Sequence, residues 1–118
     1  MKGRVVLVLW GEDTDCRACA LRDAGWFVEV EEEDGGRIFH IIRNESPDAV
    51  VIDLSRRAAH GRELARALWA TAATRWLPLV FVGGPAEAVE KALAAAPEAQ
   101  WVPWDGLLAA LEVLVKGE

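Results

Sequence analysis

The sequence predicts an α/β fold in which five strands alternate with five helices, a (βα)₅ doubly wound parallel sheet. Short apolar, β-branched runs recur at Val5–Leu9, Ala49–Ile52 and Leu79–Val82, as expected of strands covered on both faces. Segments with helical spacing or helix-capping residues separate these runs. Such alternation favours right-handed crossovers and a mostly parallel sheet, formed by one domain over residues 1–118.

The elements of the first half have local signals. Thr14 and Asp15 are suited to cap a helix that Gly25 ends. Trp26–Val30 is expected to be the second strand, and the apolar spacing within Arg37–Asn44 predicts a short amphipathic helix. The first half therefore contributes two βα units and leads into the third strand.

In the second half, the third strand ends at Asp53, and Gly61 is expected to begin a helix that continues to Trp69. Pro85 suits the start of a further helix, because its missing N–H costs nothing in the first turn. The remaining elements are expected at Ala86–Ala95 (helix), Gln100–Val102 (strand) and Asp105–Val115 (helix).

Composition excludes several classes of protein. Apolar residues make up 53 % of the 118 residues, enough for a real core, and the net charge of −6 argues against a nucleic-acid surface. No apolar run approaches the roughly 20 residues of a membrane span. Met1–Arg4 leads directly into a strand without a signal-peptide pattern, and the two cysteines form no disulfide framework. We therefore expect a bacterial-type cytoplasm.

Ligand chemistry in a parallel α/β sheet gathers just beyond the C-terminal ends of the strands. Asp53 is the carboxylate that the sequence places at that edge, directly after a buried strand. The other segments expected there are Trp10–Asp13, Ser55–Arg57, Gly83–Gly84 and Pro103–Trp104.

The run Pro47–Leu54 resembles the third strand of response-regulator receiver domains, which carry a phospho-accepting aspartate at the position of Asp53. Asp34-Gly35, His60–Leu64 and Leu77–Val82 resemble further receiver segments, so the resemblance covers essentially the whole chain in order. It implies the flavodoxin-like strand order 2-1-3-4-5 and a stand-alone signalling module. It also implies protein partners, either a histidine kinase or a downstream effector, and a possible homodimer.

The sequence departs from the receiver pattern around this aspartate. Trp10 and Gly11 stand where receivers have two acidic residues that hold Mg²⁺ with the phospho-acceptor. Gly83 replaces a serine or threonine after the fourth strand, and Val102 replaces a lysine before Pro103. Of the usual pocket, only Asp53 keeps its position.

Mg²⁺ prefers octahedral oxygen ligands, so Asp53 alone is a poor site for it. Glu12 or Asp13 would complete a site if their loop folds back over the strand ends. We therefore expect a receiver-like, non-enzymatic module that signals without phosphorylation or with altered phosphorylation. Two alternatives stay open: a working, atypical Mg²⁺-dependent phospho-acceptor, and a carboxylate at position 53 that only orders the following loop.

Cys16 and Cys19 form a Cys-x-x-Cys at a predicted helix N-terminus, which lowers a thiol pKa and suggests a thiol–disulfide oxidoreductase as an alternative function. The acidic neighbourhood disfavours a thiolate, and both residues can instead pack inward as small apolar side chains. A zinc site has less support, because His40 and His60 do not supply a second ligand pair at suitable spacing.

Other enzyme signatures are absent from the sequence. It has no Gly-Lys-Ser/Thr or Gly-x-Gly-x-x-Gly phosphate loop, and neither Ser46 nor Ser55 has a convincing partner for nucleophilic catalysis. Trp10 is expected to cover the end of the sheet or to plug the metal position.

Six tryptophans without a tyrosine are unusual usage. Trp101 and Trp104 flank the end of the fifth strand, where they either form a partner interface or pack against Leu107 and Leu108. A basic patch beside Asp53 is either solvated or paired with the acidic run 31–34; it consists of Arg56, Arg57 and Arg62.

Overall fold

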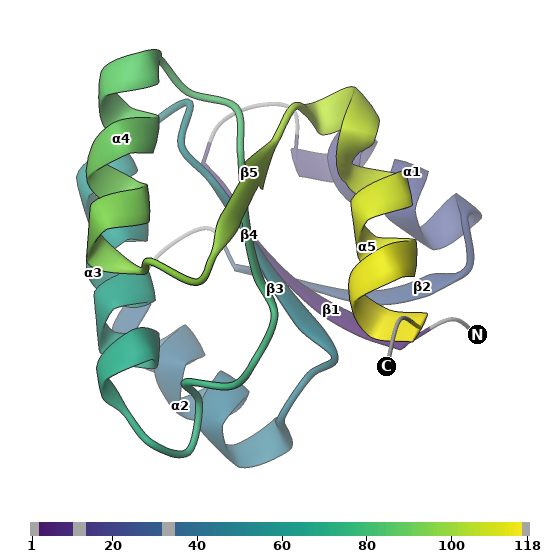
Figure 1. Cartoon of the computed structure of the whole chain (residues 1–118). Coiled ribbons are helices and arrows are strands. Elements are labelled where there is room, and N and C mark those ends of the chain that lie inside the picture. Colours follow the sequence, from purple (N-terminus) through teal and green to yellow (C-terminus); the bar gives the residue numbers. More distant parts are fainter. Residues whose placement is uncertain (1–2, 11–13, 32–34, 117–118) are drawn as a thin grey trace.

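The computed structural model describes residues 3–10, 14–31 and 35–116 (Figure 1). Strands and helices alternate strictly through these ranges. The strands are β1 (Gly3–Val8), β2 (Trp26–Glu31), β3 (Ala49–Asp53), β4 (Leu79–Val82) and β5 (Gln100–Val102). The α-helices are α1 (Thr14–Asp23), α2 (Gly35–Glu45), α3 (Ala58–Ala70), α4 (Ala86–Ala95) and α5 (Leu107–Lys116), and a 3₁₀ turn, η1 (Trp104–Gly106), precedes α5.

The five strands form one parallel sheet in the order β2-β1-β3-β4-β5. Helices α2, α3 and α4 cover one face and α1 and α5 cover the other, as Figure 1 shows. The strand order reverses beside β1, so β1 and β3 are the adjacent central strands at the switch point. The predicted fold class and strand order are confirmed.

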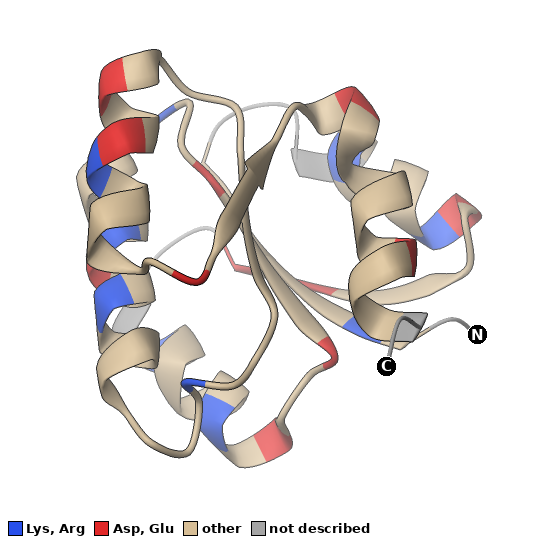
Figure 2. Cartoon of the chain, in the orientation of Figure 1, with Lys and Arg blue, Asp and Glu red and all other residues tan. Residues whose placement is uncertain are grey.

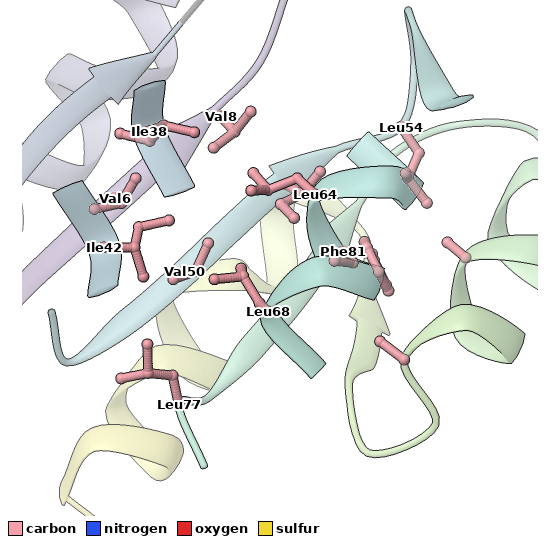
Figure 3. Packing of buried hydrophobic residues seen from close by; sticks show 14 of the residues in the cluster. Val6, Val8, Ile38, Ile42, Val50, Leu54, Leu64, Leu68, Leu77 and Phe81 are labelled. Carbon is pink, nitrogen blue, oxygen red and sulfur yellow. The ribbon is translucent and has the colours of Figure 1, made fainter. Parts of the chain in front are cut away.

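Two apolar cores lie on the two faces of the sheet. One packs under α2, α3 and α4 around Phe81 and Leu64 (Figure 3), and the other lies under α1 and α5 around Leu21 and Leu111. Strand β3 separates the cores, and each of its five residues is buried. The continuous apolar runs in the sequence are thus explained by strands that bury both faces.

Glycine and proline end or begin several helices as predicted. Gly25 has a φ of 103° and its N–H donates to the carbonyl of Arg22 at 2.9 Å, which closes α1. Pro85 immediately precedes α4. The prediction that Gly61 begins the third helix is wrong, because α3 already begins at Ala58.

Gly61 has a packing role instead. A Cβ at this position would lie 2.7 Å from Cγ2 of Ile52, so the absent side chain lets α3 lie close against β3. The last helix also differs from the prediction: the turn η1 intervenes, and α5 begins at Leu107 rather than at Asp105. This turn carries Trp104.

Charged residues lie mainly on the helices. Figure 2 shows residues of both charges on α3 and α4. Two of these pairs are close enough to interact, Arg66 with Glu63 at 3.8 Å and Lys91 with Glu87 at 4.0 Å, and both are exposed. Within the described ranges, none of the helices has the length and apolar character that crossing a bilayer requires.

Candidate functional site around Asp53

Asp53 is the last residue of β3 and pairs in register with Val82 of β4. Its side chain is only 4 % exposed, although the residues that follow it, Ser55 and Arg56, are exposed. The sequence therefore placed this carboxylate correctly at the C-terminal edge of a central strand. The local reason is that the apolar run Ala49–Ile52 continues the strand up to the first charged residue.

Two donors converge on one oxygen of Asp53. The hydroxyl of Ser55 donates to Oδ1 at 2.9 Å, and the indole N–H of Trp104 donates to the same oxygen at 3.2 Å. Ser55 was expected to have no partner for nucleophilic catalysis; its hydroxyl instead donates to this carboxylate, a contact that was not predicted from the sequence. The Asp-x-Ser spacing was the available signal, because such side chains commonly order the turn that follows a strand.

Burial raises the pKa of Asp53 above its ordinary value of 3.8, because desolvation disfavours the charged form. Hydrogen bonds from the Ser55 hydroxyl, the Trp104 indole and the Ser55 backbone oppose this rise, as does the positive charge of Arg17. Desolvation outweighs these stabilising contacts.

The cation near Asp53 comes from α1. The guanidinium carbon of Arg17 lies 4.3 Å from the centre of the Trp104 ring, a cation–π contact. Val102, the last residue of β5, stands where the resemblance to receiver domains implies a lysine. Sequence reasoning missed Arg17, because only the fold shows which residues of α1 lie beside the β5–α5 connection.

Gly83 lies against the same carboxylate. Its φ is +67°, and a Cβ there would be 2.8 Å from Oδ1 of Asp53 and 2.5 Å from the hydroxyl oxygen of Ser55. The glycine therefore leaves space that Asp53 and Ser55 fill. Its carbonyl accepts a hydrogen bond from the indole N–H of Trp101 at 2.9 Å.

The two tryptophans proposed as interface residues have different surroundings. Trp101 is 36 % exposed. Trp104 is half-buried, packs against the cluster that contains Leu107, and contacts Asp53. Whether either side chain binds a partner stays a prediction.

Glu12 and Asp13, the other proposed Mg²⁺ ligands, lie outside the described residues. Over residues 3–10, 14–31 and 35–116, no group of three or more His, Cys, Asp or Glu side chains is arranged to hold a metal ion. Oδ1 of Asp53 is already an acceptor for two protein donors. The described residues thus do not fit a Mg²⁺ centre.

Trp10 lies buried in the core under α2, α3 and α4, with an edge-to-face contact to His60 at 6.0 Å between ring centres. Both expected roles, covering the end of the sheet and plugging the metal position, stay predictions. In the acidic run, Glu31 is buried and pairs with Arg37 of α2, while residues 32–34 are outside the described ranges. Pairing of that run with the basic patch near Asp53 stays a prediction.

Cys16 and Cys19 are both exposed and free. The prediction that they pack inward is wrong, because Ala18 and Leu21 form the buried side of α1.

A hollow of about 230 Å³ lies away from Asp53, where the loop after α3 meets the start of β4; its lining includes Trp69, Trp76, Leu77, Glu98 and Leu114.

Comparisons with known proteins identify the fold. No family model matches the sequence, and no curated protein does. Solved structures do match. One is the receiver domain of a Pseudomonas aeruginosa sensor histidine kinase, described with a magnesium ion coordinated in its active-site cleft. It has a TM-score of 0.83 at 17 % identity, and the match covers 97 % of this chain and 98 % of that one.

Two further structures agree. A chemotaxis response regulator of Vibrio cholerae has a TM-score of 0.74 at 19 % identity, covering 94 % of this chain and 97 % of its own. The receiver domain of a Syntrophus aciditrophicus histidine kinase has a TM-score of 0.73 at 16 % identity, covering 96 % and 90 %. The chain has the receiver-domain fold of response regulators and sensor kinases.

Proposed function

We propose that this chain is a receiver-like signalling module that acts through protein–protein contacts and not as an enzyme, with Asp53 as its central site. The observation that supports it most is the position of Asp53. This carboxylate ends a central strand at the switch point of a receiver-type sheet, and it accepts hydrogen bonds from Ser55 in the following turn and from Trp104 of η1. In α/β sheets that edge is where ligands and signals act.

In this proposal the module does not depend on ordinary acyl-phosphate chemistry. Phosphoryl transfer to a carboxylate requires Mg²⁺ and donors that stabilise the phosphoryl oxygens. Gly83 offers no hydroxyl, Val102 offers no cation, and Oδ1 of Asp53 is held by Ser55 and Trp104. Arg17 contributes a positive charge near the site: its guanidinium lies over the Trp104 ring, and its charge opposes the rise in the pKa of Asp53.

The partner in this proposal is a histidine kinase or a downstream effector in the cytoplasm, with a homodimer as a further possibility. Exposed apolar side chains on β5 and α5 support a protein partner: Trp101 is 36 %, Leu108 39 % and Val113 70 % exposed. The net charge of −6 disfavours nucleic acid as the partner.

The test is phosphorylation of the purified chain by a small acyl-phosphate donor with Mg²⁺, read by intact mass. We expect no gain of a phosphoryl group under conditions that label an ordinary receiver domain in a parallel reaction. Asp53→Asn is the site variant, and Asp23→Asn, an exposed carboxylate at the end of α1, is the matched control.

A phosphoryl adduct that disappears in Asp53→Asn and persists in Asp23→Asn would overturn the phosphorylation-independent form of the proposal. Steady release of inorganic phosphate from the donor, abolished in Asp53→Asn, would contradict the non-enzymatic role. An adduct present equally in all three proteins is chemical modification elsewhere and leaves the expectation for Asp53 met.

A further inference from the structure

Trp104 joins two parts of the molecule that are far apart in sequence. Its indole N–H donates to Oδ1 of Asp53 at 3.2 Å, although 51 positions separate the two residues. Trp104 is also the first residue of η1, the turn that links β5 to α5. One side chain therefore connects the central carboxylate to the segment that begins the last helix.

The contact is electrostatically directed. An ionised carboxylate strengthens a hydrogen bond from an uncharged N–H donor, so the Trp104 bond depends on the charge at Asp53. The guanidinium carbon of Arg17 lies over the Trp104 ring, 4.3 Å from its centre, and its positive charge favours the ionised carboxylate. The Trp104 ring thus contacts a carboxylate of β3 through its N–H and a guanidinium of α1 through its face.

A second indole ties the same segment to β4. Trp101 of β5 donates to the carbonyl of Gly83 at 2.9 Å, and a Cβ on Gly83 would lie 3.4 Å from the indole nitrogen of Trp104. Beyond η1, Leu107 is buried at 2 % exposure and anchors the start of α5. A change in the position of Trp104 therefore acts on a short connection that the Trp101–Gly83 hydrogen bond holds at one end and buried Leu107 holds at the other.

We propose that Trp104 is the positioning residue through which the charge at Asp53 acts on the β5–α5 segment, and that Arg17 is the cation that holds Trp104 in place. This inference rests on the proposed function of Asp53 as the signalling site. Loss of the negative charge at Asp53, by any chemistry, weakens the Trp104 bond and the attraction of Arg17 together. The ring then leaves its place and the segment 101–108 changes its conformation.

The test is NMR of the full chain labelled with ¹⁵N, with Asp53→Asn as a nearly isosteric neutral replacement. The chain has six indole N–H groups, and Trp104→Phe assigns the signal of Trp104. We expect Asp53→Asn to shift the Trp104 indole signal and to accelerate its exchange with solvent. The Trp76 indole, which donates to the carbonyl of Ala73 in the loop after α3, is the internal control and is expected not to move.

The coupling itself is measured as a double-mutant cycle on backbone amide shifts of residues 101–108. In the Trp104→Phe background, the change produced by Asp53→Asn is expected to fall about twofold or more. In the Trp76→Phe background, which removes an indole N–H on another loop, it is expected to stay unchanged. Arg17→Gln is expected to reduce the coupling and Arg17→Lys to restore part of it, whereas Arg75→Gln, which removes a cation near the Trp69 ring at 5.7 Å, has no effect.

Two results overturn the inference: an unmoved Trp104 signal in Asp53→Asn, or an undiminished amide change in the Trp104→Phe background. The indole signals outside the segment 101–108 report whether each variant keeps its fold; they belong to Trp10, Trp26, Trp69 and Trp76. None of these measurements uses a phosphodonor. If Asp53 accepts a phosphoryl group, the proposed phosphorylation independence fails while this coupling can still hold. If Asp53→Asn leaves the Trp104 signal unmoved, this coupling fails while the proposed phosphorylation independence can still hold.

Discussion

At Asp53, burial and hydrogen bonding act on one carboxylate in opposite directions. The side chain is 4 % exposed, so ionisation carries a desolvation cost that Ser55, Trp104 and Arg17 reduce but do not remove. The outcome is a raised pKa. A buried carboxylate with a raised pKa is typical of functional sites, and it supports the proposed signalling role of Asp53.

The sign of the pKa shift gives a stability prediction. At pH 7 Asp53 is ionised in the unfolded chain, and the folded state pays for its desolvation; this cost is relieved as the pH falls through the folded pKa towards 3.8. We therefore expect Asp53→Asn to raise the free energy of unfolding at pH 7. The gain shrinks as the pH falls and is smallest near 3.8.

Urea unfolding at a series of pH values, in a metal-free buffer, measures this difference. Asp23→Asn is the control, because Asp23 is exposed, and it is expected to change stability by no more than about 0.5 kcal/mol at any pH. A gain for Asp53→Asn that grows with acidification contradicts the predicted direction.

At the scale of elements, close packing of α3 against β3 depends on a residue without a side chain. Gly61 lies within the helix, where glycine is unfavourable by about 1 kcal/mol relative to alanine. The neighbouring Cγ2 of Ile52 belongs to a β-branched side chain on the central strand, which has little freedom to move. Glycine at this position therefore lowers the helix propensity of α3 but allows the helix to contact the sheet closely.

Gly61→Ala is expected to destabilise the protein despite its better helix propensity. Overpacking of this kind costs about 1–3 kcal/mol, and the propensity gain offsets about 1 kcal/mol, so we expect a net loss of up to about 2 kcal/mol. Gly106→Ala is the matched control: its Cβ would have no neighbour nearer than 3.6 Å, and we expect a change within about 0.5 kcal/mol. Chemical unfolding measures the free energy of unfolding of both variants. A Gly61→Ala protein more stable than the original would contradict the prediction, because it would show that α3 can shift to accommodate the added methyl group.

On the scale of the whole molecule, the sheet divides the interior into two cores, and Phe81 of β4 is the largest fully buried side chain. Phe27 of β2 is 52 % exposed on an edge strand, with Arg4 at 5.7 Å from its ring. The same residue type thus occurs at the two extremes of burial.

Phe81→Ala is expected to cost about 3–5 kcal/mol, because it removes a buried ring and leaves a cavity. Phe27→Ala is expected to cost no more than about 1 kcal/mol. Midpoints of urea unfolding at constant slope measure both values. Similar losses for the two variants would contradict the burial of Phe81 and the exposure of Phe27.

Much of the fold followed from local patterns. Runs such as Ala49–Ile52 are long enough for one strand and too short for a helix, and glycine or proline separates them from their neighbours, as at Gly25 and Pro85. The position of Asp53 followed from the same patterns, since it is the first charged residue after a buried strand. The position of Gly61 in the interior of α3 could not be predicted from local patterns, because its close approach to Ile52 leaves no trace in the local sequence.

The sequence by itself determined the order and kind of the elements and the position of Asp53, because periodicity and capping act between residues close along the chain. Only the tertiary structure decided which groups surround that carboxylate. Trp104 is 51 positions away, and Arg17 belongs to a helix on one face of the sheet that α5 shares. Their convergence depends on the strand order and on how α1 and α5 pack together, and these are long-range consequences of burying two cores at once.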